Sequence, residues 1–140
     1  MKLLTYAFLS YISAILLSNS ASANPVQEES ILCKNKKLLT MLAFSTSEYN
    51  IAICKESLGG FHYIHQNRKN KTQIFLPVIK KNDPYSGVNP WLLKASKGGF
   101  TYQVANFNPL GKNGSVSISI FKNGRKIYHR ITKNFIRSDE

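Results

Sequence analysis

The sequence predicts an all-β fold of about eight short antiparallel strands, forming either a small barrel or a two-sheet sandwich. Residues 115–133 alternate apolar and polar side chains around Asn123-Gly124, the strongest short-range signal of a β-hairpin. Residues 91–104 alternate in the same way around Lys97-Gly98. Similar runs separated by turn residues fill most of the remaining chain, and no segment shows a sustained helical period.

The hairpin at 115–133 is expected to be a half-buried ribbon. With a two-residue turn, position 120 faces 127, position 118 faces 129 and position 116 faces 131. One face of the ribbon then carries Val116, Ile118, Ile120, Ile127, His129 and Ile131. The other face carries Ser115, Ser117, Ser119, Phe121, Lys126, Tyr128, Arg130 and Thr132. A ribbon with one apolar face needs a second sheet to cover that face.

Residues 1–23 are typical of a cleaved secretory signal, with Lys2 before an apolar stretch and Ala21-Ser22-Ala23 as a small-x-small cleavage site. A single membrane anchor is the alternative, but hydroxyl-bearing residues interrupt the apolar run. The expected organisation is a signal peptide at 1–23, a mobile leader at 24–30, a β-domain at 31–134 and a C-terminal tail at 135–140. The protein is therefore expected to be exported, to the periplasm or outside the cell.

The chain is strongly basic, with a formal net charge of +12 over 140 residues. Removal of residues 1–23 leaves 117 residues and takes away one lysine. Between Ser30 and Ser138 the acids are Glu48, Glu56 and Asp83, against 18 lysines and arginines. Such a domain attracts polyanions. A solvated basic surface that only keeps the protein soluble is the equally weighted alternative.

The two cysteines, Cys33 and Cys54, predict a disulfide, because exported proteins with an even cysteine count usually pair them. Closing a loop of about 20 residues contributes on the order of 3 kcal/mol in the chain-entropy model. Two buried free thiols are the alternative. No histidine lies close to either cysteine in sequence, so a metal site is not expected there.

Residues 38–55 predict a hairpin with a loop at 45–48 and apolar side chains on both faces. Leu38, Thr40, Leu42 and Phe44 share one face with Tyr49, Ile51 and Ile53, and Leu39, Met41, Ala43, Ala52 and Cys54 share the other. A helix over 38–44 is the competing interpretation. Strands follow at 61–66 and 73–79, and Pro77 places the second of these at a sheet edge or a bulge. The longest expected loop is 82–90.

The hairpin at 91–104 is expected to place its turn at Lys97-Gly98. Trp91, Leu93, Ala95, Phe100, Tyr102 and Val104 then share one face. Core packing of Trp91 is favoured over a ligand-stacking role, because its position has the same parity as its apolar neighbours.

The sequence predicts no catalytic residue, no metal site and no cofactor. His62 and His65 are three positions apart on an expected strand, so they point to opposite faces and cannot hold one metal ion together. His129 falls on the expected apolar face. A small basic nuclease using two histidines and a lysine is a further alternative, although no spacing brings these residues together.

Basic residues interleaved with aromatic residues give the stronger functional signal. They cluster around two expected hairpins and define a predicted anion-binding patch: Arg68, Lys69, Lys71, Lys122, Arg125, Lys126, Arg130 and Lys133. Binding to such a patch is salt-sensitive, because neutralised anions release counterions.

Several runs resemble small exported β-domain proteins of cyanobacteria that have no assigned activity: YNIAIC, FHYI, IFLPV, LKASKGGFTYQV and SIFKNGRKIY. The resemblance covers about Cys33 to Tyr128 and implies a periplasmic β-domain, while it names no catalytic residue. A more remote likeness, carried by residues 98–102, is to periplasmic inhibitors of c-type lysozyme. Those inhibitors meet a cationic target, which would repel this basic chain.

The functional expectation is an exported, non-enzymatic, envelope-associated binding module that contacts an anionic polymer, either an envelope polysaccharide or a nucleic acid. The alternatives are a protein inhibitor or interaction module acting through loops such as 82–90, and a small secreted nuclease.

Overall fold

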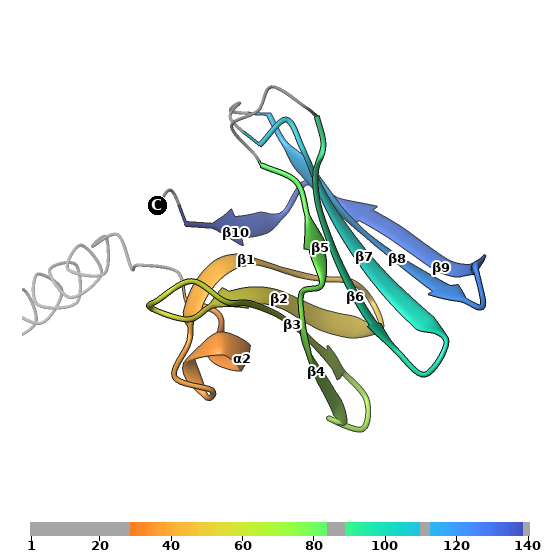
Figure 1. Ribbon diagram of the computed structural model, residues 1–140, viewed down its shortest axis with the longest axis horizontal. Helices are drawn as coiled ribbons and strands as arrows, with labels where there is room; N and C mark the ends of the chain where they lie inside the picture. The colour runs from red at the N-terminus through yellow and green to blue at the C-terminus, as the bar shows by residue number, and fades with distance from the viewer. Residues whose placement is uncertain (1–28, 84–88, 110–112, 139–140) are drawn as a thin grey trace, which may run out of the picture.

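The computed structural model describes residues 29–83, 89–109 and 113–138. Within these residues the chain forms two antiparallel sheets of five strands each, which pack face to face as a sandwich (Figure 1). This confirms the predicted all-β class and selects the sandwich over the closed barrel. The predicted signal peptide, most of the predicted leader and the middle of the 82–90 loop lie outside the described residues.

The first sheet has the strand order β10-β1-β2-β3-β4, and the second has β5-β6-β7-β8-β9. The strands are β1 (Leu39–Ser45), β2 (Tyr49–Lys55), β3 (Phe61–Asn67), β4 (Gln73–Pro77), β5 (Lys80–Lys81), β6 (Trp91–Lys97), β7 (Phe100–Phe107), β8 (Ser115–Lys122), β9 (Arg125–Thr132) and β10 (Phe135–Arg137). Each strand pairs with its neighbours in sequence within its sheet, and β10 returns to pair with β1. The chain is therefore an up-and-down meander.

Two runs of the chain pass from one sheet to the other, so the ten strands correspond to eight continuous runs. Val78 donates its backbone N–H to Phe61 of β3, and the next residue, Ile79, donates to Lys94 of β6. The run β4–β5 therefore changes sheet between consecutive residues. The run β9–β10 also changes sheet, across Lys133 and Asn134, because Thr132 pairs with β8 and Phe135 pairs with β1. The last residues were predicted to be a tail, but Phe135–Arg137 forms this strand.

A short helix that the sequence pattern did not predict, α2 (Ile31–Lys34), covers the outer face of the first sheet. Ser30 caps it by accepting a hydrogen bond from the Leu32 N–H. Leu32 and Cys33 are buried against Ala43, Ala52 and Ile64. The predicted disulfide from Cys33 to Cys54 is present and ties the helix to β2. Among the described residues, no helix is long and apolar enough to cross a membrane.

Both faces of the β1–β2 hairpin are covered, as the sequence predicted, and the helical alternative for 38–44 is wrong. The inner face joins the main core through Leu42, Phe44, Ile51 and Ile53. One detail differs, because a bulge between Thr40 and Leu42 shifts the register. Thr40 therefore pairs with Cys54 of the outer face, and Met41 joins the main core.

The β6–β7 hairpin has the predicted faces but a different turn. Gly98 and Gly99, both with positive φ, form the turn, so that Lys97 pairs with Phe100. The pairing differs from the predicted one by an even number of residues, which leaves every side chain on its predicted face. Trp91 is buried in the main core, as expected, and its indole N–H donates to the Asn82 carbonyl. Pro77 ends the edge strand β4, also as expected.

The β8–β9 hairpin has the predicted Asn123-Gly124 turn but not the predicted register. Near the turn Lys122 pairs with Arg125, but a bulge follows and Ile120 pairs with Tyr128 rather than with position 127. Because of this extra residue, each following side chain of β9 lies on the opposite face of the strand from the predicted one. Ile127 and Ile131 are therefore exposed on the outer face, and His129 lies with them rather than on the apolar face. Tyr128 and Arg130 take the inner positions.

The bulge predicts different costs for two isoleucines that the sequence pattern places on one face. Ile118→Ala should lower the free energy of unfolding by about 3 kcal/mol, because Ile118 is fully buried. Ile131→Ala should cost less than about 1 kcal/mol, because 60% of Ile131 is exposed. Chemical denaturation of both variants measures the two values. Equal costs would contradict the bulged register.

Candidate functional site

Four hairpin turns meet at one end of the sandwich, which we call the hairpin end (Figure 1). They join β1 to β2, β3 to β4, β6 to β7 and β8 to β9. Backbone hydrogen bonds link them in pairs, because Arg68 donates to the Glu48 carbonyl and Asn123 donates to the Gly99 carbonyl. Side chains of β9 reach the β1–β2 turn and connect the two pairs. The turns therefore hold fixed positions relative to one another.

Seven cationic side chains lie in or beside these turns: Arg68, Lys69, Lys71, Lys97, Lys122, Arg125 and Lys126. Six of them belong to the predicted patch, and all seven are exposed. Sequence reasoning missed Lys97. The predicted turn at Lys97-Gly98 could have placed Lys97 in the patch, because alternate turns of a meander lie at the same end of the sheet.

Glu48 is the one described acidic residue at the hairpin end, and the other described acids, Glu29, Glu56 and Asp83, lie elsewhere in the fold. Among the described residues, no carboxylate forms an ion pair with the lysines of the hairpin end. Two of the lysines instead lie over aromatic rings. Lys122 Nζ is 5.4 Å from the centre of the Phe100 ring, and Lys126 Nζ is 5.7 Å from that of Phe121.

The other members of the predicted patch have different roles. Arg68 donates to the Thr46 carbonyl at 2.7 Å and so braces two turns. Arg130 pairs with Glu48 at 3.3 Å and lies over the Tyr128 ring. Lys133 follows the end of β9 that is opposite the β8–β9 turn, so it lies apart from the cations of that turn. The structure therefore brings together most of the predicted patch, but Lys133 is separated from it.

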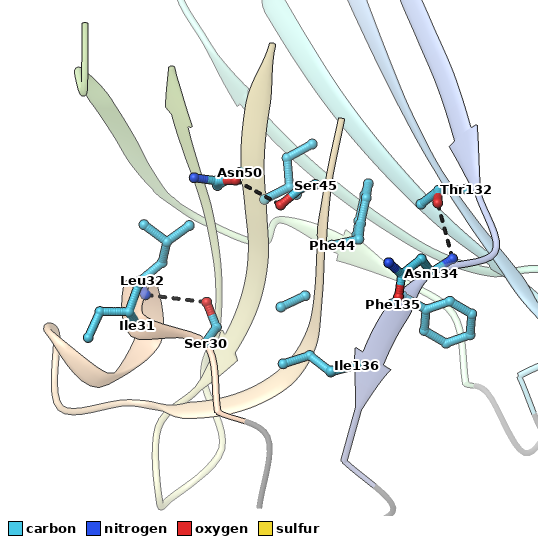
Figure 2. Close-up of a pocket in the computed structure, with 12 residues that line it drawn as sticks. Ser30, Ile31, Leu32, Phe44, Ser45, Asn50, Thr132, Asn134, Phe135 and Ile136 are labelled. Atoms are coloured by element: carbon cyan, nitrogen blue, oxygen red, sulfur yellow. Dashed lines mark hydrogen bonds between the residues drawn. The ribbon is translucent and has the colours of Figure 1, made fainter. Parts of the chain in front are cut away.

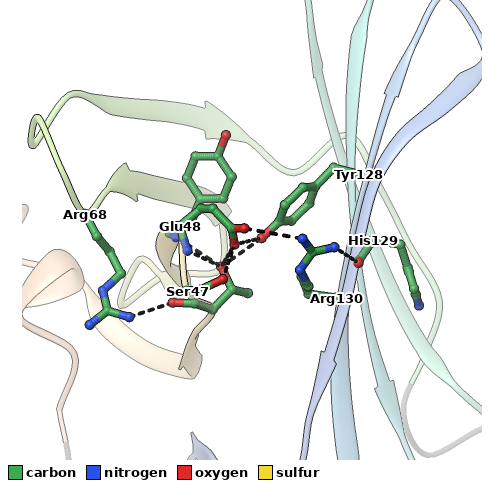
Figure 3. Close-up of polar contacts among 8 residues, drawn as sticks. Ser47, Glu48, Arg68, Tyr128, His129 and Arg130 are labelled. Carbon is green, nitrogen blue, oxygen red and sulfur yellow. Dashed lines mark hydrogen bonds and ion pairs between the residues drawn. The ribbon is translucent and has the colours of Figure 1, made fainter.

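A polar network centred on Glu48 joins the two sheets (Figure 3). The Tyr128 hydroxyl of β9 donates to Glu48 Oε2 at 2.6 Å, and it lies 2.9 Å from Thr46 Oγ1. Ser47 donates to the same carboxylate oxygen at 2.7 Å, and Arg130 donates to Oε1. The Ser47 and Tyr128 hydrogen bonds lower the pKa of Glu48 to about 2. Burial and the Glu48 carboxylate raise the pKa of Tyr128 to about 12.

Aromatic rings close the core beneath the hairpin end. His65 of β3 is buried, with its ring centre 4.7 Å from that of Tyr49 and 5.2 Å from that of Tyr102. Its Nδ1 lies 3.0 Å from the Tyr63 hydroxyl. Burial lowers the pKa of His65 to about 4, so the ring is neutral near pH 7. The ring therefore serves as part of the core.

The three histidines lie in separate places. His62 and His65 point to opposite faces of β3, as predicted. His62 Nε2 lies 2.8 Å from Glu56 Oε1, and its ring stacks on Phe75, while its buried Nδ1 has no hydrogen-bond partner. His129 lies on the outer face of the second sheet, with Nδ1 2.8 Å from Ser119 Oγ. In the described part of the chain, no group of three His, Cys, Asp or Glu residues could hold a metal ion.

A groove of about 420 Å³ opens beside β1, between α2 and β10 (Figure 2). Its lining combines apolar side chains with neutral hydroxyl and amide groups: Ser30, Ile31, Leu32, Ala43, Phe44, Ser45, Asn50, Ile51, Thr132, Asn134, Phe135 and Ile136. None of these side chains is charged. The lining therefore offers neither an acid–base group nor an ion pair to a ligand.

No protein-family model matches this chain, and no match was found among curated proteins or among solved structures. The resemblance to exported cyanobacterial β-domains and the likeness to lysozyme inhibitors therefore stay predictions.

The Glu48 network predicts acid sensitivity. A carboxyl group whose pKa falls on folding stabilises the protein above its unfolded pKa, near 4.5, and loses this effect as the pH falls toward about 2. Glu48→Gln should be less stable than the parent above pH 4.5, and the difference should shrink as the pH approaches 2. Denaturation midpoints across this range measure it, with Glu29→Gln as the control. A constant difference would contradict the role of the carboxylate.

His65 predicts a second pH dependence in a higher range. A histidine whose pKa falls from 6.5 to about 4 on folding becomes protonated at a higher pH in the unfolded state than in the folded state. The neutral ring contributes its full stabilisation above pH 6.5, and the free energy of unfolding falls by about 3 kcal/mol as the pH drops to 4. His65→Gln should flatten this part of the curve of unfolding free energy against pH. His129→Gln, which changes an exposed ring, should leave it unaltered, and the reverse pattern would refute the assignment.

Proposed function

We propose that this protein is an exported, non-enzymatic binding module whose hairpin end contacts an anionic polymer, either a cell-envelope polysaccharide or a nucleic acid. The observation that carries this proposal is the convergence of cationic side chains from three turns that are distant in sequence. Lys69 and Lys71 come from one turn, Lys97 from the second, and Lys122 and its neighbours from the third.

Charge neutralisation at this end is weak, which favours an external anion. Glu48 already accepts a hydrogen bond from Tyr128 and pairs with Arg130, so its carboxylate has partners other than the lysines of this end. The lysines extend from turns whose backbones are hydrogen-bonded together. Their relative positions are therefore partly ordered before binding, which reduces the entropy lost when a polymer docks.

Export is part of the proposal, and the Cys33–Cys54 disulfide supports it, because such bonds persist in oxidising compartments. A nuclease is less well supported, since the three histidines lie on separate faces. A protein inhibitor acting through the 82–90 loop remains the alternative, and a salt-insensitive complex would favour it.

The test is retention of the protein on a short oligothymidylate and on a sulfated polysaccharide across a salt series. Lys69→Ser, Lys97→Ser and Lys122→Ser together remove one charge from each of three turns. If these lysines contact phosphates, the slope of log affinity against log salt should decrease in magnitude by about 2 for a single strand. Affinity should fall on both polymers because the interaction is electrostatic.

A matched control removes the same total charge away from the hairpin end, by Lys34→Ser, Lys55→Ser and Lys80→Ser. This variant should keep most of the affinity and most of the salt slope. Equal losses in the two variants would show that only net charge matters and would overturn the proposed surface. Absence of binding by the parent protein on both polymers would overturn the proposed function.

A further inference from the structure

Strand β9 is the longest open edge in the described part of the sandwich. It has eight residues and forms the outer margin of the second sheet (Figure 1). The other sheet edges are shorter: β5 has two residues, β10 has three, and β4 has five and ends in Pro77. An open edge strand presents unpaired N–H and C=O groups to which another strand can bond.

The bulge gives this edge an apolar outer face. Ile127 and Ile131 are 53% and 60% exposed, and His129 lies between them. On the adjacent strand β8, Ser117 and Ser119 have small side chains and are buried, so they do not project above the sheet. Residues at 127, 129 and 131 have the spacing of successive side chains on one face of a strand. Alternate side chains of an extended segment that paired with β9 would have the same spacing and could contact these three residues.

The charge along β9 indicates which kind of extended segment can bind to this edge. Arg125, Lys126, Arg130 and Lys133 lie along the edge, and residues 113–138 contain no acid. A second copy of the chain would bring these cations against one another, and like charges on paired strands are destabilising. A segment with carboxylates is attracted instead. The edge therefore combines a backbone template, an apolar strip and a charge that excludes self-pairing.

We propose that β9 binds an extended acidic segment of a partner protein as an added strand. The backbone of the segment pairs with β9, its apolar side chains cover Ile127 and Ile131, and its carboxylates lie beside Arg125, Lys126 and Lys133. This mode of binding is strand addition, in which main-chain hydrogen bonds give affinity and alternate side chains give specificity. The site shares Arg125 and Lys126 with the hairpin end, but it does not require Lys69, Lys97 or Lys122.

The probe is an end-blocked peptide of alternating valine and glutamate with the length of β9. Titration should show saturable binding, and hydrogen exchange should slow at amides of β9. A peptide with lysine in place of glutamate should not bind, because its charge is wrong. Polyglutamate should bind more weakly than the alternating peptide, because it lacks apolar side chains. Equal binding of the lysine peptide, or no binding of the glutamate peptide, would overturn the proposal.

The matched variants separate the apolar strip from general surface hydrophobicity. Ile127→Ser with Ile131→Ser should weaken peptide binding about tenfold, equivalent to about 1.4 kcal/mol for two lost cross-strand contacts. Leu58→Ser with Ile79→Ser changes two other exposed apolar residues and should leave the affinity unchanged. Equal weakening in both variants would refute the site.

Two measurements keep this site distinct from the hairpin end. The variant with serine at Lys69, Lys97 and Lys122 should retain most of its peptide affinity and still show protection along β9, even if it loses the polymer. Protection confined to the turns would overturn strand addition. Sedimentation of the free protein should show a monomer, and a dimer whose β9 amides are already protected would identify a second copy as the occupant and refute the acidic partner.

Discussion

Ile127 is one residue more than the β8–β9 ladder accommodates, and its position fixes the direction of every side chain that follows in β9. Without the bulge that it forms, Tyr128 and Arg130 would face solvent and Ile127 and Ile131 would face the core. With it, Tyr128 reaches the β1–β2 turn, where its hydroxyl donates to Glu48. The bulge therefore creates the polar connection between the two sheets at the hairpin end. It also leaves the apolar strip on the outside of the sandwich.

The meander topology explains why so many cations meet at one end. Alternate connections of an up-and-down chain lie at the same end, so lysines from residues 69, 97 and 122 are brought together although they are far apart in sequence. Their mutual repulsion opposes folding. Contacts between Lys122 and Phe100, and between Lys126 and Phe121, offset part of this repulsion, since a cation over an aromatic ring contributes about 0.5–1 kcal/mol at an exposed site.

The features that the sequence predicted correctly are those with local causes. Alternation around Asn123-Gly124 gives a hairpin, and the parity of Trp91 with its neighbours places it in the core. The bulges were not predictable, because an extra residue changes no composition and only the partner strand reveals it. Four helical residues and a three-residue β10 are too short for a periodic pattern. Among the candidate site residues, the turn lysines were predictable as exposed charge. The bracing roles of Arg68 and Arg130 depend on contacts across more than 20 and 80 positions of sequence.

The same hairpin contributes to both proposed sites, but the forces at the two sites differ. At the hairpin end, charged groups act through solvent, so salt screens the attraction over a distance of about 8–10 Å at physiological strength. Along β9, main-chain hydrogen bonds and contacts with Ile127 and Ile131 do not depend on ionic strength in this way. Arg125 and Lys126 belong to both surfaces, because the strand starts where the turn ends. A polymer and an acidic strand therefore compete for these two residues and for no other part of their sites. Because the two sites overlap only at these residues, a bound polymer should weaken the binding of the acidic strand without preventing it.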